Sequence, residues 1–154
     1  FYAHPNNTID NEIDLISLFA MLYSKTEKNE MGYHSKLVPL LEFAYAHIKA
    51  LQTWNGEEIH PYYPKISFNL LKLYAYTNDN AKAIEIAKEL CNYYEQLNDT
   101  TQYINLLTIL SQLYDNAGMT NQHDSCQNIL EVSPIYQEFL KLLEEKNDTT
   151  KSIN

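Results

Sequence analysis

The chain has 154 residues, of which 45% are hydrophobic and 20% are charged, and it contains only three Gly and five Pro. This composition excludes a disordered or collagen-like protein. Its formal net charge is −9 and it contains no Arg, which argues against direct binding of this segment to DNA or RNA because phosphate recognition needs basic side chains. No apolar stretch approaches the roughly 20 residues that a membrane-spanning helix needs, so we expect no membrane segment.

The first predicted helices lie between residues 9 and 54. Residues 9–25 form the first one, because apolar residues recur every three to four positions at Ile13, Ile16, Ala20 and Tyr23. Residues 37–54 form the second, whose apolar face is Leu37, Leu40, Leu41, Ala44, Ile48 and Leu51. Pro39 would lie in its first turns, where proline is tolerated. The two prolines of residues 59–64 favour extended backbone, so we expect a kinked entry to the next helix.

The remaining helices are predicted over residues 65–77, 80–97, 100–117, 120–130 and 133–146. Asn78-Asp79 and Gly118 mark links so short that the helices on either side must pack antiparallel. No segment shows the apolar-polar alternation of a half-buried strand. The sequence therefore predicts an all-α domain over residues 1–146 and a flexible tail over residues 147–154.

One residue pattern occurs twice in this part of the chain. Tyr114 follows Tyr74 by 114 − 74 = 40 positions, and Leu110 follows Leu70 by the same interval. A fixed interval of this size is typical of solenoid proteins. In such proteins a large residue of the first helix fills the space within a helical pair, and small residues such as Ala83 and Ala87 let the second helix approach closely.

The stretch from Phe68 to Tyr74, followed by Asn78-Asp79 and then Ala83 and Ala87, resembles a tetratricopeptide repeat. The resemblance implies a TPR-like α-solenoid of about three helical hairpins and a C-terminal helix. It departs from the family's pattern where a Gly or Ala is usual, at Leu71 and Ser111, and where His123 replaces the first alanine of the third pair.

The 40-residue interval and the long second helices are also similar to the C-terminal sensor domains of the Rgg, PlcR and PrgX group. These are bacterial transcription regulators that bind short signalling peptides, as in quorum sensing. The similarity covers about residues 65–143. It implies a peptide- or protein-binding module that senses a ligand for a larger regulator, and the start of the chain at Phe1 instead of Met leads us to expect a piece of a longer protein.

Stacked helical pairs present their leading helices on a concave surface. By resemblance to the family, the ligand-facing positions are Lys65, Phe68, Asn69, Lys72, Tyr76, Asn105, Thr108, Gln112 and Asn116. Asn and Gln amides donate and accept hydrogen bonds at once, which suits the backbone of a bound peptide. The same residues are equally expected on a merely solvated helix face. Further contact area, for a ligand or a neighbouring protomer, could come from tyrosines that we expect to be exposed, Tyr62, Tyr63, Tyr93 and Tyr94.

The sequence contains no pattern typical of an enzyme, and we expect neither catalytic residues nor a cofactor. The five histidines, His4, His34, His47, His60 and His123, have no metal-ligand spacing among themselves or with the cysteines. Cys91 and Cys126 lie beside apolar residues in helical patterns, so we expect buried reduced thiols of a cytoplasmic protein. The alternative function is structural, in which the repeats serve homodimerisation or scaffold assembly.

Overall fold

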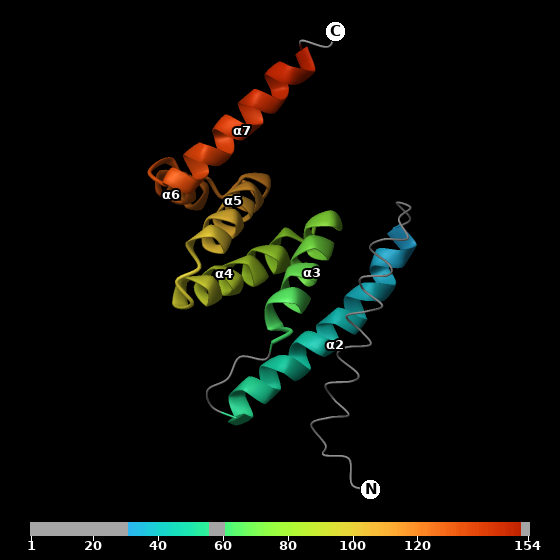
Figure 1. Ribbon diagram of the computed structural model, residues 1–154. Helices are drawn as coiled ribbons and strands as arrows, with labels where there is room; N and C mark the ends of the chain where they lie inside the picture. The colour runs from blue at the N-terminus through green and yellow to red at the C-terminus, as the bar shows by residue number, and fades with distance from the viewer. Residues whose placement is uncertain (1–30, 56–60, 152–154) are drawn as a thin grey trace, which may run out of the picture. The chain divides into compact units, whose positions relative to one another are not determined.

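The computed structural model describes residues 31–55 and 61–151 (Figure 1). Throughout these residues the secondary structure is helical and contains no strand, which confirms the expected all-α class. The helices are α2 (Met31–Asn55), α3 (Tyr63–Tyr76), α4 (Asn80–Gln96), α5 (Thr100–Asn116), α6 (Thr120–Glu131) and α7 (Pro134–Lys151). The helix predicted over residues 9–25 lies outside the described residues, as do residues 59 and 60 of the predicted kink at 59–64. Of the remaining residues of that kink, 61 and 62 form a turn, and 63 and 64 already belong to α3.

The chain divides into two compact units, residues 1–86 and 87–154, whose boundary falls inside α4. The first unit contains α2, α3 and the start of α4, and the second contains the rest of α4 with α5, α6 and α7. Helix α7 continues to Lys151, five residues beyond the predicted end at 146 and into the segment for which a flexible tail is predicted. Neither Gly nor Pro follows Asn147, so no residue there stops the helix.

Two helices begin earlier than their sequence patterns indicate. Helix α3 begins at Tyr63, with Pro64 in its first turn, where the missing N–H of proline would have no partner in any case. Helix α2 begins at Met31, so Pro39 lies inside the helix and not in its first turns. A proline there removes one hydrogen bond of the helical ladder.

Three successive helices end in the same type of turn. Asn78, Asn98 and Gly118 follow α3, α4 and α5 with φ values of 59°, 54° and 68°, in the left-handed region. After each of them the next N–H donates to a carbonyl inside the finished helix, as Asp79 does to Tyr74 at 2.9 Å. Asn and Gly are the residues that tolerate this conformation, which explains why short links at these positions were visible in the sequence.

In the first unit, α2 packs against α3. Four of the predicted apolar positions of α2 are buried, namely Leu37, Leu41, Ala44 and Ile48. Leu40, predicted on the same face, is instead 45% exposed, beside Phe43 at 51%. The correction follows from helix geometry: Leu40 and Leu41 differ by 100° around the helix axis, so a single neighbouring helix cannot cover both.

A polar contact joins the helices of the first unit near Tyr74. The Tyr74 hydroxyl donates a hydrogen bond to Oε1 of Glu42, and Lys82 Nζ donates to the same oxygen at 3.2 Å. The Lys82 ammonium also lies 5.3 Å from the centre of the Tyr74 ring. The hydrogen bond from Tyr74 lowers the pKa of the Glu42 carboxyl, with a smaller contribution from Lys82, against the opposing effect of burial. Burial, followed by the Glu42 contact, raises the pKa of Tyr74.

Replacement Glu42→Gln should reduce the acid sensitivity of the protein. The pKa of Glu42 is lower in the folded protein than its value near 4.5 in the unfolded chain. The ionised Glu42 carboxylate therefore stabilises the fold fully above pH 4.5, and this stabilisation is lost as the pH falls through the folded-state pKa. We expect Glu42→Gln to cost up to about 1 kcal/mol at pH 7, the range of a solvent-screened pair, and less at pH 3. Urea unfolding at both pH values measures this, and a cost that does not change with pH would contradict it.

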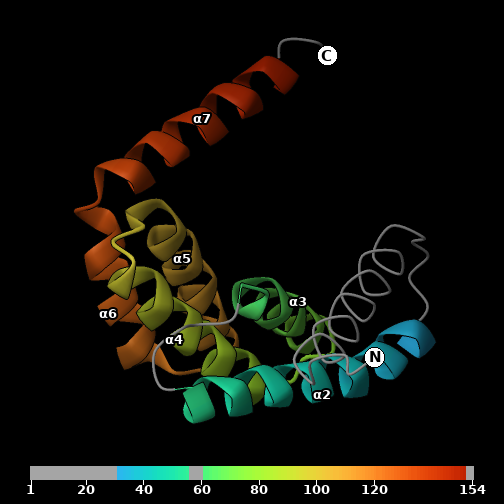
Figure 2. The ribbon, with the colours of Figure 1, turned by 60° about the horizontal axis from the view of Figure 1, so that its bottom comes forward.

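In the second unit, α5 packs against α6, and α7 contacts both of them. The buried residues of α5 include Ile104, Leu106 and Leu110, and those of α6 are Cys126 and Leu130. Helix α7 begins beside α6 and runs away from the α5–α6 pair, as the views in Figures 1 and 2 show. Its residues from Lys141 to Asp148 are accordingly all exposed.

The 40-residue interval of the sequence recurs in the structure. Helices α3 and α5 end at Tyr76 and Asn116, and α4 and α6 begin at Asn80 and Thr120, each pair 40 positions apart. Burial follows the same register, because Ile66, Ser67, Leu70, Leu71, Leu73 and Tyr74 of α3 correspond to the buried Leu106, Leu107, Leu110, Ser111, Leu113 and Tyr114 of α5. The two helices therefore present equivalent faces to the interior and to solvent.

Candidate functional site

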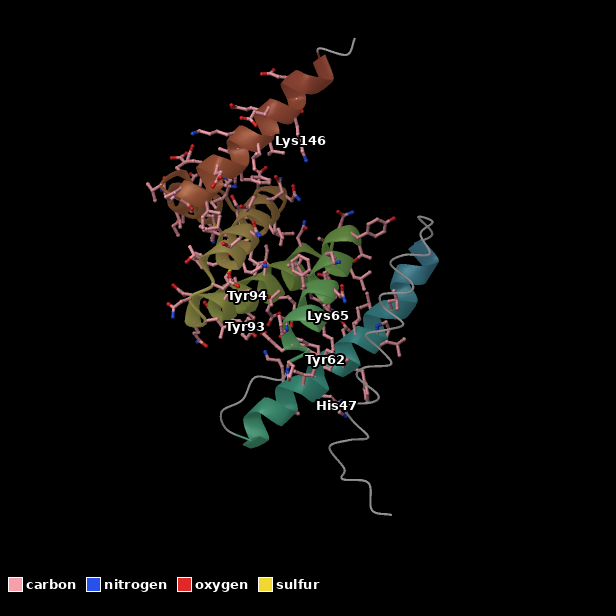
Figure 3. The ribbon with its side chains drawn as sticks, viewed as in Figure 1. His47, Tyr62, Lys65, Tyr93, Tyr94 and Lys146 are labelled. Atoms are coloured by element: carbon pink, nitrogen blue, oxygen red, sulfur yellow. The ribbon has the colours of Figure 1, made fainter. Side chains whose placement is uncertain are left out.

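The predicted ligand-facing residues of α3 lie together on the outer face of that helix. Lys65, Phe68, Asn69, Lys72 and Tyr76 follow the spacing of one helical face, opposite the buried Leu70. Both lysines are exposed, Asn69 is half-buried, Phe68 is 37% exposed and Tyr76 is 46% exposed. Figure 3 shows Lys65 near the beginning of α3. This face therefore combines two cationic groups with two accessible aromatic rings.

One contact orders part of the α3 face. The ammonium of Lys72 lies 5.3 Å from the centre of the Phe68 ring, one turn earlier in the helix. A cation over an aromatic face at an exposed site is stabilised by about 0.5–1 kcal/mol. No carboxylate of the described residues forms an ion pair with Lys65 or Lys72, so within this part of the chain neither lysine has a neutralising acid.

The predicted residues of α5 form a second face of the same kind but without charge. Asn105, Gln112 and Asn116 are exposed, and Thr108 is half-buried. The Thr108 hydroxyl donates to the Ile104 carbonyl at 2.9 Å, and Gln112 Nε2 donates to Asn116 Oδ1 at 3.2 Å. Thr108 is therefore engaged within its own helix, whereas the amides of Asn105, Gln112 and Asn116 lie at the surface.

The two faces occupy equivalent positions of the repeat. Lys65, Phe68, Lys72 and Tyr76 lie 40 positions before Asn105, Thr108, Gln112 and Asn116. The α3 set belongs to the first unit and the α5 set to the second. Each set is brought together by its own helix, as the spacing predicts.

The four tyrosines predicted to be exposed differ in their surroundings. Tyr63 is only 6% exposed, so the prediction is wrong for this residue. Its ring stacks on Tyr45 of α2 with ring centres 6.3 Å apart, and the early start of α3 turns it inward. Tyr62, Tyr93 and Tyr94 are half-buried (Figure 3), and the rings of Tyr93 and Tyr94 meet edge to face at 4.9 Å.

A serine and a histidine lie in contact between α5 and α6, although the sequence shows no nucleophile motif. Nδ1 of His123 is 3.0 Å from both the hydroxyl and the backbone oxygen of Ser111. The amide of Gln127 donates to the same hydroxyl at 2.9 Å. Ser111 is only 1% exposed, so no substrate can reach its hydroxyl. The contact is a polar link between two helices, and catalysis at Ser111 is not compatible with this burial.

The repeat explains why these three residues meet. Their counterparts 40 positions earlier are Leu71, Ala83 and Ala87, which are 0 to 1% exposed. At these positions the later pair carries Ser111, His123 and Gln127, so three departures from the apolar pattern occur together and satisfy one another's hydrogen bonds. Sequence reasoning noted Ser111 and His123 as separate departures and missed that they are partners.

Other candidates for chemistry are structural or lack partners. Cys91 and Cys126 are buried and free, and burial raises the pKa of both thiols, that of Cys91 to about 12. A neutral thiol of this kind is unreactive. Within residues 31–55 and 61–151, no group of three His, Cys, Asp or Glu side chains could hold a metal ion. In the same part of the chain no helix has the length and apolar character needed to cross a membrane.

Comparison of the chain with protein-family models, with curated proteins and with solved structures finds no match. The functional interpretation therefore depends on the residues and contacts of this chain. Of these, the α3 face carries the most information, because exposed aromatic rings next to uncompensated charges are not needed for folding.

Proposed function

We propose that this chain is a peptide- or protein-binding module of the tetratricopeptide type, which contacts its ligand through the outer faces of α3 and α5. The observation that carries the proposal is the exposure of Phe68 and Tyr76 on the same face of α3 as Lys65 and Lys72. A face that serves only solubility would carry charged and amide groups, whereas clustered accessible aromatic rings are typical of interaction surfaces.

The α5 face supports the same role by a different chemistry. The amides of Asn105, Gln112 and Asn116 can donate to a peptide carbonyl and accept from a peptide N–H at once. Hydrogen bonds to the peptide backbone tolerate variation of the ligand's side chains. The aromatic rings of α3, in contrast, would favour ligands with apolar side chains at the positions that they contact. The two faces occupy equivalent positions of the repeat, each within its own unit.

The resemblance stated above extends the proposal to the biological role. The module would sense a short peptide for a larger bacterial transcription regulator in the cytoplasm. The ligand-induced signal would then pass to a DNA-binding part elsewhere in that protein, since the segment itself has a net charge of −9 and no Arg.

Screening an unbiased library of short peptides against the chain tests the binding function. We expect at least one binder, and we expect Asn69→Ala combined with Asn105→Ala to weaken it about tenfold, as the loss of one hydrogen bond at each position predicts. Asn92→Ala combined with Asn128→Ala is the matched control, because both residues are exposed and lie on neither face. No binder, or equal binding by both double variants, would refute the proposal.

A structural role in self-assembly is the second candidate. Helix α7 leaves Phe139, Leu142 and Leu143 between 42% and 54% exposed on one side of the helix. Exposed apolar residues in this arrangement suit a helix that pairs with another. Sedimentation equilibrium distinguishes this role, because a chain that remains monomeric at all concentrations cannot assemble through α7.

A further inference from the structure

We infer that the segment bound by α3 is acidic, with two carboxylate side chains on either side of an apolar one. This inference rests on the proposed function and adds the chemical class of the ligand. It starts from the distribution of charge along the chain. Residues 59–78 contain no Asp or Glu, although the whole chain has 20 acidic residues against 11 basic ones.

The two lysines of α3 are the positive groups of that interval. Both are exposed, and neither forms an ion pair with a carboxylate of the described residues. The acid Glu42 of α2, the helix that packs against α3, is engaged by Lys82 and by the Tyr74 hydroxyl. Among the described residues the charge of Lys65 thus meets no acid, and Lys72 contacts only the neutral ring of Phe68, so both ammonium groups can accept a ligand carboxylate as ion-pair partner.

The chain as a whole has a net charge of −9, which repels an acidic ligand, whereas Lys65 and Lys72 attract it. Which of the two effects dominates depends on the distance over which charges interact in salt solution. At physiological salt, charges separated by more than about 8 Å are largely screened. A carboxylate in contact with Lys65 or Lys72 therefore senses these ammonium groups more strongly than distant acidic residues. The α5 face cannot attract an acid in this way, because no Lys occurs between Lys88 and Lys141.

The spacing of the side chains indicates the pattern of the ligand. Lys65 and Lys72 lie seven residues apart, a rise of about 10.5 Å along the helix, with Phe68 between them. In an extended peptide every second side chain points the same way, and positions i and i+4 lie about 13 Å apart. Flexible lysine side chains can span the difference. Alternate residues of the order acidic, apolar, acidic would then meet Lys65, Phe68 and Lys72.

Synthetic ten-residue peptides with a central Glu-Ser-Leu-Ser-Glu segment test this inference. Their ends are acetylated and amidated, so the only carboxylates are those of the side chains. Two matched peptides carry Gln or Lys in place of both Glu residues. We expect the Glu peptide to bind the unaltered chain about tenfold more tightly than the Gln peptide, and the Lys peptide to bind least. The preference should shrink as salt is raised from low to high concentration.

Charge reversal of the two lysines provides the decisive comparison. Lys65→Glu combined with Lys72→Glu should invert the preference, so that the Lys peptide binds best. Lys88→Glu combined with Lys141→Glu changes the net charge equally at exposed positions on other helices, and should keep the preference for Glu. Circular dichroism of both double variants verifies that they fold.

The outcomes separate this inference from the proposed function. If the unbiased library yields binders but the three synthetic peptides bind equally or not at all, the inference is refuted and the binding function remains. If the reversed variant still prefers Glu, the inference is refuted as well. If neither the library nor the synthetic peptides bind, both the function and the inference are refuted.

Discussion

Replacement Tyr74→Ala should destabilise the protein by about 3–5 kcal/mol, the range for truncation of a buried aromatic residue. Tyr74 is only 6% exposed, and its hydroxyl and ring contact Glu42 and Lys82. Truncation removes the ring, leaves a cavity beside α2, and leaves Glu42 without its hydroxyl partner. Urea unfolding monitored by circular dichroism measures the change in the free energy of unfolding.

Two further variants separate the causes of this loss. Tyr74→Phe keeps the ring and removes the hydroxyl, so we expect a cost of about 1–2 kcal/mol. Tyr76→Ala removes a ring that is 46% exposed on the same helix, and its cost should stay below about 1 kcal/mol. Equal losses for Tyr74→Ala and Tyr76→Ala would mean that the register of α3 is wrong.

Replacement Leu130→Ala should have a comparable effect on the second unit. Leu130 lies in α6 and is fully buried, as is Leu90, its counterpart 40 positions earlier. Loss of a buried leucine costs about 2–5 kcal/mol, because the apolar contacts are lost and the cavity closes only in part. The free energy of unfolding from urea denaturation is again the measurement.

The adjacent residue is the matched control for Leu130. Ile129 is 44% exposed, so Ile129→Ala removes a side chain of similar size from a largely solvated position. Its expected cost is less than about 1 kcal/mol. If Ile129→Ala proved as costly as Leu130→Ala, the inner and outer faces of α6 would have to be exchanged.

Local features of the fold could be predicted because they depend on residues close in sequence. Asn78 and Gly118 mark turns in which a left-handed residue is needed, and α2 to α6 each end within one residue of the predicted position. The burial of Tyr74 and Tyr114 follows from their shared place in the 40-residue interval. The nine predicted binding residues lie on the outer faces of two helices for the same reason, since helical periodicity decides which residues share a face.

Contacts between distant residues could not be predicted. Glu42 meets Tyr74 and Lys82 from 32 and 40 positions away, and periodicity gives no information on which polar residues of two helices will meet. The link of Ser111 with His123 and Gln127 was missed for the same reason. The exposure of Leu40 was missed because α2 is apolar over more than one face, and sequence alone does not show which side a neighbour covers.

The most direct test of the binding function is to map the ligand on the isotope-labelled chain by nuclear magnetic resonance, with the tightest peptide from the unbiased library. The proposal predicts that the largest amide shift changes fall on α3 and α5 near Lys65, Phe68, Asn69, Lys72, Tyr76, Asn105, Thr108, Gln112 and Asn116. Shift changes confined to α6 and α7, with α3 and α5 unaffected, would contradict it.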